Sequence, residues 1–207
     1  MGLLRLLFKN PMAFLVIALP LLYSIILHEL AHGWVAYRLG DPTAKQRGRL
    51  SLNPLKHLDP IGTLMLFTFG FGWAKPVPVN FGQLRPRRLG MILVSAAGII
   101  ANMLLAFLAF FLDRLFAPHP ESMSAALLYF LAQINIILAA FNLIPLPPLD
   151  GSKILLGFAP PNVQKVLLRI EPYGFFIIIG LLYFGALDPV INFFKFMILS
   201  VIRFLLS

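Results

Sequence analysis

The chain has 207 residues, of which 59% are hydrophobic and only 12% charged, and its mean hydropathy is +0.88. Soluble domains carry about 25% charged residues, so this composition excludes an ordinary soluble domain and indicates a membrane protein embedded in a lipid bilayer. The formal charge of +9 does not indicate a nucleic-acid partner, because the basic residues lie between apolar segments, where they set topology and contact anionic lipid. The absence of cysteine excludes disulfides, thiolate metal sites and cysteine nucleophiles.

A membrane-spanning helix needs about 20 mainly apolar residues. Such segments occupy residues 13–38, 89–112 and 124–146, and "ALDPV" (186–190) divides a further apolar stretch into segments 172–186 and 190–206. We therefore predict an all-α polytopic membrane protein, a bundle of about five or six transmembrane helices that forms a single membrane-embedded domain over residues 1–207. Residues 2–9 are expected to form a short interfacial helix.

Between the first two spans, residues 61–80 ("IGTLMLFTFGFGWAKPVPVN") are too short and too rich in glycine for a full span. Proline alternates with valine in the second half of this segment. That pattern is typical of an extended edge, because proline cannot donate a hydrogen bond to a strand ladder. We interpret residues 61–80 as a short re-entrant loop or β-hairpin element that dips into the membrane.

Basic residues predict the orientation in the cell membrane. Nine of the seventeen lysines and arginines lie in residues 38–88, and loops rich in these residues remain in the cytoplasm. Residues 38–88 and 147–171 are therefore expected in the cytoplasm and residues 113–123 on the outside of a multi-pass protein.

Three ionisable residues lie inside the first predicted span, in "HELAH" (28–32). His28 and His32 are four residues apart, so they share one helix face and can bind one ion. Glu29 lies one position round the helix, beside such an ion, where the general base for a bound water belongs. Two core histidines that only hydrogen-bond to neighbours are the alternative. Because the chain has only four histidines and ionisable groups at membrane depth are costly, the pattern favours a metal site.

A third ligand is needed, and the candidates are His57 and the remaining acids. Asp150, in "FNLIPLPPLDGSK" (141–153), follows the third span where that span is expected to reach the cytoplasm. Three prolines break the helix before Asp150, and Gly151 permits a sharp turn that would aim the carboxylate into the bundle. A plain helix-ending turn would look the same. Five of the other acids are expected on the far side of the membrane or in the polar loop: Asp113, Glu121, Asp188, Asp41 and Asp59.

Together these motifs resemble a known family. "HELAH" on a membrane helix, followed some 110 residues later by "NLIPLPPLDG" (142–151), is similar to the site-2 protease family of intramembrane zinc metalloproteases. The resemblance covers residues 13–155, the expected catalytic core, and leaves the C-terminal helices (166–206) outside it. Residues 53–66 and 72–80 also resemble the minimal bacterial members, and 207 residues leave no room for the PDZ domain or CBS pair of larger members.

The resemblance implies a zinc metalloendopeptidase with one Zn²⁺ per chain, held by His28, His32 and Asp150, with Glu29 as the base. It also implies that Asn142 steadies the substrate or the oxyanion. The expected substrates are single-span membrane proteins, in some cases trimmed first by another protease, cut in or near the transmembrane segment. A metal-binding transporter and a non-catalytic scaffold are the alternatives.

Three further polar residues remain. Two of them allow both a functional and a structural interpretation, and the third is expected to have a structural role. His57 either approaches the site and contacts substrate or forms a turn with Asp59. Asn102 either hydrogen-bonds the substrate backbone or, together with Ser95 and Gly98, allows close helix contact. Asn135 is expected to hydrogen-bond between helices.

Overall fold

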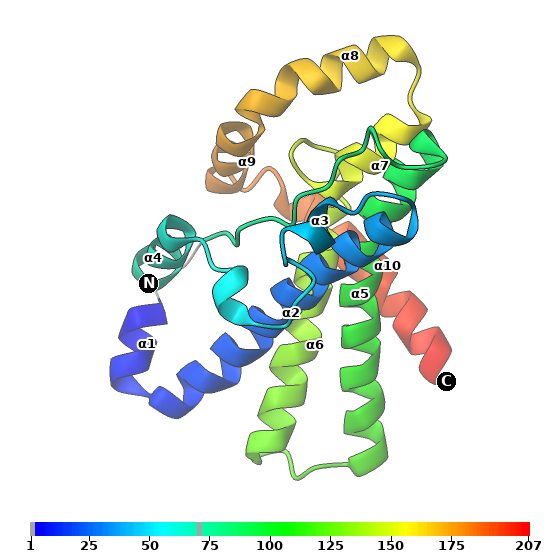
Figure 1. Cartoon of the computed structure of the whole chain (residues 1–207). Helices are drawn as coiled ribbons and strands as arrows, with labels where there is room; N and C mark the ends of the chain where they lie inside the picture. Colours follow the sequence, from blue (N-terminus) through cyan, green and yellow to red (C-terminus); the bar gives the residue numbers. More distant parts are fainter. Residues whose placement is uncertain (1–2, 70–71) are drawn as a thin grey trace.

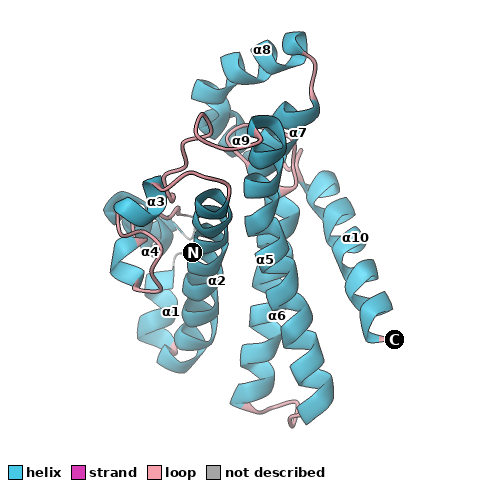
Figure 2. Ribbon diagram, turned by 45° about the vertical axis from the view of Figure 1, so that its right-hand side comes forward, coloured by secondary structure: helices cyan, strands magenta, loops and turns pink. Residues whose placement is uncertain are grey.

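The chain folds into a helical bundle built round three long helices (Figure 1). In the computed structural model, which describes residues 3–69 and 72–207, α2 (Pro11–Arg38), α5 (Arg87–Phe116) and α6 (Met123–Asn142) pack against one another. The last helix, α10 (Asp188–Leu206), lies along the side of this group (Figure 2). The described residues contain no β-strand, so the predicted all-α class is confirmed.

Five segments are long and apolar enough to cross a membrane: Pro11–Arg38, Arg87–Phe116, Met123–Asn142, Pro161–Tyr183 and Asp188–Leu206. The fourth consists of α8 (Pro161–Ile170), the 3₁₀ turn η2 (Glu171–Tyr173) and α9 (Gly174–Tyr183), and the chain bends between α8 and α9 (Figure 1). This segment begins eleven residues before the predicted start at 172. The chain is a multi-pass membrane protein.

The helix ends follow from local sequence. Asn10 begins α2, because its side chain accepts a hydrogen bond from the Ala13 N–H and Pro11 occupies the first turn. Ser122 caps α6 in the same way. The third predicted span was expected to reach residue 146, but α6 ends at Asn142, because the prolines that follow cannot continue a helix. The turn at 143–149 then leads into α7 (Asp150–Phe158), which packs on α5.

The β-hairpin alternative for residues 61–80 is wrong. Residues Pro60–Phe69 form α4, whose start is capped by a hydrogen bond from the Gly62 N–H to Asp59 Oδ1 at 2.8 Å. The following residues are extended from 74 to 80, and they pair only through one isolated bridge between Leu58 and Ala74. Residues 70 and 71 of the predicted segment lie outside the described residues. The re-entrant alternative stays a prediction.

Short helices complete the chain on either side of α2. The interfacial helix expected at residues 2–9 is helical as α1 (Leu3–Lys9), which contacts α4, and residue 2 lies outside the described residues. After α2 come α3 (Thr43–Gln46) and the 3₁₀ turn η1 (Pro54–Lys56). The interfacial position of α1 stays a prediction.

The core of the bundle combines small and branched side chains. Buried alanines on α5 and α6 allow the two helices to approach closely, and isoleucines of α5, α6 and α10 fill the space between them: Ala106, Ala139, Ala140, Ile99, Ile136, Ile198 and Ile202. Lipid is as apolar as these side chains, so close van der Waals packing, more than burial, holds membrane helices together.

We expect Ile136→Ala to destabilise the protein by about 2–5 kcal/mol, because it leaves a cavity at a fully buried position. The neighbouring Ile137 is 46% exposed, and its replacement by alanine should cost about 0.5 kcal/mol or less. Thermal unfolding of both variants in the same detergent measures the difference. Equal losses of stability would contradict the packing described for α6.

Candidate active site

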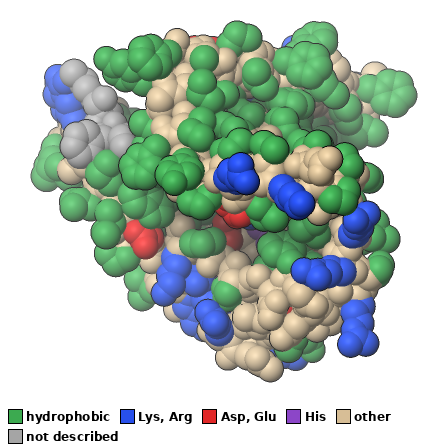
Figure 3. Space-filling model, turned by 90° about the horizontal axis from the view of Figure 1, so that it is seen from above, with side chains coloured by type: hydrophobic (Ala, Val, Ile, Leu, Met, Phe, Trp, Pro, Cys, Tyr) green, Lys and Arg blue, Asp and Glu red, His purple; other side chains and the backbone are tan. Residues whose placement is uncertain are grey.

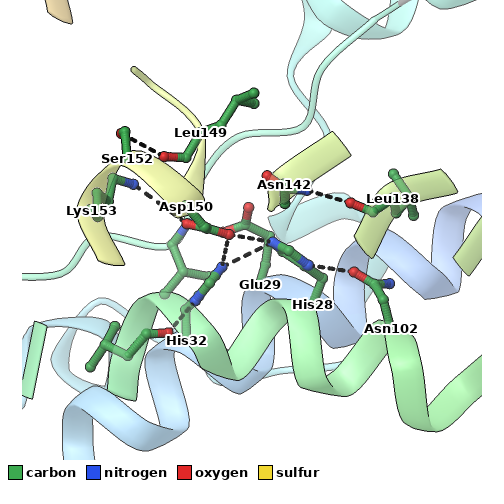
Figure 4. A network of polar contacts seen from close by, with 12 residues as sticks. His28, Glu29, His32, Asn102, Leu138, Asn142, Leu149, Asp150, Ser152 and Lys153 are labelled. Atoms are coloured by element: carbon green, nitrogen blue, oxygen red, sulfur yellow. Dashed lines mark hydrogen bonds and ion pairs between the residues drawn. The ribbon is translucent and has the colours of Figure 1, made fainter. Parts of the chain in front are cut away.

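Two helices bring three potential metal ligands to one point. His28 and His32 come from α2, and Asp150 is the first residue of α7 (Figure 4). Their side chains are buried, with residue exposures of 7%, 8% and 6%. Asp150 Oδ2 lies 3.1 Å from His28 Nε2 and 3.0 Å from His32 Nε2, and the two Nε2 atoms are 2.9 Å apart. These residues form the one group within the described ranges 3–69 and 72–207 that is arranged to hold a metal ion.

The partners of the opposite ring nitrogens indicate which atoms face this point. His32 Nδ1 lies 2.6 Å from the Val94 carbonyl oxygen, which can only accept, so Nδ1 carries the hydrogen and Nε2 has a lone pair. His28 Nδ1 lies 2.5 Å from Asn102 Oδ1, with the same consequence. Two imidazole lone pairs and a carboxylate oxygen therefore converge.

Such a set of donors fits a metal ion. Electron pairs this close repel one another unless a cation lies among them. Ligand atoms about 2.0–2.2 Å from a tetrahedral zinc are about 3.3–3.6 Å apart, only a few tenths of an ångström more than the separations observed here. Three protein ligands with nitrogen and oxygen donors are also the usual set of a catalytic zinc site, whose fourth position stays open for water or substrate.

The surroundings of Asp150 favour its ionised form. Burial opposes ionisation of Asp150, whereas the positive charge of Lys153 favours its carboxylate form. Lys153 Nζ lies 3.7 Å from Oδ1, the oxygen that faces away from the imidazoles. A metal ion requires the carboxylate form.

Gly151 positions Asp150 by allowing close packing. A Cβ atom at residue 151 would lie 2.4 Å from the Leu143 carbonyl oxygen and 2.6 Å from that of Ile144. The first turn of α7 therefore lies directly against the end of α6, where no side chain fits. This differs from the predicted role of Gly151 in a sharp turn, since the residue is helical.

Gly98 has the same function beside the imidazoles, although only a role in helix packing was expected of it. A Cβ atom at residue 98 would lie 2.5 Å from His32 Nε2 and 2.6 Å from His28 Nε2. Its position on α5, four residues before Asn102, puts both residues on the face of α5 that meets α2. The four-residue spacing between Gly98 and Asn102 is the sequence signal that could have identified Gly98 as a residue beside the imidazoles.

Glu29 lies beside the cluster (Figure 4) and is held by the backbone of the extended segment 74–80. Its Oε2 accepts a hydrogen bond of 2.6 Å from the Val77 N–H. Within the described part of the chain, no donor is hydrogen-bonded to Oε1, so this oxygen is available to a water.

The segment 74–80 is anchored at both ends. Lys75 donates its N–H to the His57 carbonyl oxygen at 2.8 Å, and its own carbonyl oxygen accepts from Arg49 at 2.6 Å. At the other end, the Asn80 N–H donates to Asp41 Oδ2 at 2.6 Å. Asp41 was expected in the polar loop, whereas its side chain is completely buried. These anchors fix the position of Val77 and therefore the orientation of Glu29.

The remaining predicted residues have separate positions. Asn102 is fully buried and hydrogen-bonded to His28 and Asn135, so it supports a predicted ligand, and its alternative role toward substrate stays a prediction. His57 is also buried, and its Nε2 lies 2.7 Å from the Ser51 carbonyl oxygen. This contact does not involve Asp59, with which a turn was expected, and a role of His57 toward substrate stays a prediction. Asn142 donates to the Leu138 carbonyl oxygen within α6 at 3.0 Å, and its role toward substrate stays a prediction.

One end of the molecule has a hollow that contains ionisable side chains (Figure 3). Seen from the end that carries α8, lysine and arginine side chains lie on both sides of a hollow in which acidic atoms and part of a histidine are visible (Figure 3). Water can therefore approach the buried polar groups from the basic end of the bundle.

We expect Gly98→Ala to lower the affinity for zinc by about 10- to 100-fold, the usual effect of disturbing groups that support metal ligands. The added methyl group would push both imidazoles out of place, although alanine favours helix formation. Gly180→Ala in α9 is the matched control, because no atom lies within 4 Å of its Cβ position. Zinc titration of the metal-free proteins measures both, and equal affinities would contradict the contact of Gly98 with the imidazoles.

Comparison with known proteins agrees with this chemistry. The profile described as Peptidase family M50 matches residues 117–183, which include Asn142 and Asp150. The chain is 46% identical over 172 residues to "Putative zinc metalloprotease YwhC" of Bacillus subtilis (strain 168), covering 80% of this chain and 78% of the relative. It is 32% identical over 183 residues to "Putative zinc metalloprotease Rip2" of Mycolicibacterium smegmatis, covering 84% and 69%.

A more distant relative is "Zinc metalloprotease MJ0392" of Methanocaldococcus jannaschii, 31% identical over 147 residues that make up 71% of this chain and 35% of the relative. No solved structure matches the chain. With a relative 46% identical over most of both chains, the chain belongs to peptidase family M50, the site-2 protease family, and is a zinc metalloprotease.

Proposed function

We propose that this protein is an intramembrane zinc endopeptidase that hydrolyses peptide bonds in or near the transmembrane segments of other membrane proteins. The observation that carries the proposal is that Asp150 meets His28 and His32 beside Glu29, where the two histidines and Glu29 lie within a membrane-spanning helix. His28 lies ten residues before the end of α2 at Arg38, or about 15 Å along the helix. This depth suits cleavage of a substrate below the membrane surface.

Each protein group has a separate role in the proposed hydrolysis. His28, His32 and Asp150 would hold the zinc ion, which when bound supplies the Lewis acidity that polarises the scissile carbonyl and acidifies a water. Glu29 accepts the proton of the attacking water at Oε1, while the Val77 N–H holds Oε2. Glu29 then gives the proton to the amine nitrogen as the carbon–nitrogen bond breaks. One water is consumed, and the carboxylate of Glu29 is regenerated.

The extended segment 74–80 is suited to align an unwound substrate. In an extended chain, successive residues direct their backbone groups to opposite sides, and the N–H groups of Lys75 and Val77 are already bonded within the protein. Pro76 and Pro78 have no N–H, so the other side offers only carbonyl oxygens. A substrate strand that donates its own N–H groups can pair with these carbonyls, and pairing would keep the scissile bond out of a shielding helix.

The distribution of charge supports an orientation with residues 38–88 in the cytoplasm. Single-span membrane proteins, in some cases first trimmed by another protease, are the proposed substrates. A transporter would need further ionisable groups along a path through the membrane, whereas the described residues offer one metal-binding group. A scaffold would bind metal without cutting a substrate, which the following experiment tests.

We expect Glu29→Gln to lower cleavage by about 100- to 10,000-fold, because the amide cannot accept the proton, while zinc stays bound. Cells that express either the wild type or this variant should differ in a membrane-anchored protein that accumulates uncut in the variant. Glu121→Gln, in the loop before α6, is the control and should cleave normally. Cleavage at the wild-type rate by a zinc-loaded Glu29→Gln protein would refute the assignment of the base.

Because the chain has no cysteine, single introduced cysteines report orientation without background. Gln46, the last residue of α3, and Glu121, in the loop before α6, are both exposed, and the proposed orientation puts them on opposite sides of the membrane. A membrane-impermeant thiol reagent added to intact cells should label Glu121→Cys and leave Gln46→Cys unlabelled until the membrane is permeabilised. The reverse pattern would overturn the proposed orientation.

A further inference from the structure

We propose that Asn135 is a positioning residue of the metal site: through Asn102 it fixes the hydrogen of His28 on Nδ1 and so keeps the lone pair of Nε2 directed at the metal. The inference rests on the metal site of the proposed function and adds a residue from a third helix to it. Asn135 itself touches neither ligand nor substrate. Its effect passes through two hydrogen bonds between three helices, α2, α5 and α6.

The two imidazoles are oriented in different ways. His32 donates directly to the Val94 carbonyl oxygen, and a backbone carbonyl has no alternative role. His28 faces an amide side chain, Asn102. An amide can present either its oxygen or its NH₂ group by turning about its last bond. The hydrogen of His28 is therefore fixed only if the direction of the Asn102 amide is fixed.

Asn135 supplies that direction. Its Nδ2 donates to the Leu131 carbonyl oxygen at 2.8 Å and to Ser24 Oγ at 2.7 Å. Because the Leu131 carbonyl can only accept, the NH₂ group of Asn135 must point to it, and Oδ1 must point to Asn102. Asn102 Nδ2 donates to this Oδ1 at 2.7 Å, which leaves Asn102 Oδ1 for His28.

Among the described residues, no other contact orients the Asn102 amide as strongly as Asn135 does. Its Nδ2 also approaches the Ser24 carbonyl oxygen, but the distance is 3.5 Å, which makes a weak hydrogen bond at best. Asn102, Asn135 and Ser24 are all fully buried, so water cannot replace a lost partner. Without Asn135 the amide of Asn102 can turn and donate to Nδ1, and the hydrogen of His28 then moves to Nε2, where it blocks metal binding.

Asn135→Leu removes the acceptor and keeps a similar shape. We expect it to lower zinc affinity by about 10- to 100-fold, as is typical for groups that orient a metal-bound histidine. Ser24→Ala is the matched control, because it deletes a buried hydrogen bond to the same Asn135 amide while Leu131 still directs that amide. Its zinc affinity should stay within about twofold of the wild type, since the donor–acceptor order is unchanged.

A second change separates orientation from structural damage. In Asn102→Asp both side-chain oxygens are acceptors, so the direction of the side chain no longer matters. The double variant Asn102→Asp with Asn135→Leu should therefore recover zinc affinity to within about tenfold of the wild type, by the carboxylate–histidine pairing common in zinc sites. Damage to packing at Asn135 would not be repaired by this change.

The location of the hydrogen can be observed directly. With four histidines in the chain, nitrogen NMR of histidine-labelled, metal-free protein can resolve the protonated and bare ring nitrogens. His28 Nδ1 should carry a hydrogen in the wild type and in Ser24→Ala, and should lose it in a substantial fraction of Asn135→Leu molecules.

Two results would overturn the inference. One is a bare His28 Nδ1 in the metal-free wild type, which requires no variant to fold. The other is an Asn135→Leu protein whose zinc affinity lies within about twofold of Ser24→Ala, far below the effect expected for an orienting group. Neither readout uses proteolysis. A wild type that binds zinc but cuts no substrate would therefore contradict the proposed function without affecting the test of Asn135.

Discussion

Inside the bundle two imidazole nitrogens and a carboxylate oxygen approach one another to 2.9–3.1 Å with their electron pairs directed inward. In water such groups would be solvated separately, but at this depth solvent is scarce and the repulsion is screened little. A divalent cation converts the repulsion into three bonds. In the proposed metal site, an ion held by residues of both helices would therefore stabilise the arrangement of α2 and α7.

Much of the polar structure near the site serves this arrangement. Gly98 and Gly151 remove side chains where the imidazoles and α7 need room. The Val94 carbonyl and the Asn102 amide direct the two histidines. Each of these polar groups is buried and satisfied, as buried polar groups must be in a membrane protein. The site is thus specified by the packing of α5 against α2 as well as by its ligands.

The sequence was informative where chemistry follows from spacing along one element. The period of the α-helix puts His28 and His32 on one face, and the prolines before Asp150 end α6, so the helical class and the candidate ligands could be predicted. The register of α5 against α2 depends on contacts between residues far apart in the chain, and local patterns do not encode it. For this reason Gly98 was assigned only to packing, and neither of the two alternatives for Asn102 included its hydrogen bond with His28. The hydrogen bond from Val77 to Glu29 joins residues 48 positions apart and was out of reach for the same reason. The helix α4 was missed because the glycines that follow it suggested a loop.

X-ray absorption at the zinc edge of purified, zinc-loaded protein tests the central claim most directly. The account predicts one zinc per chain with a first shell of nitrogen and oxygen at about 2.0–2.2 Å, including two imidazoles, and predicts that this signal disappears in Asp150→Ala. A protein that binds no zinc, or a zinc environment that is identical in the wild type and in Asp150→Ala, would contradict it.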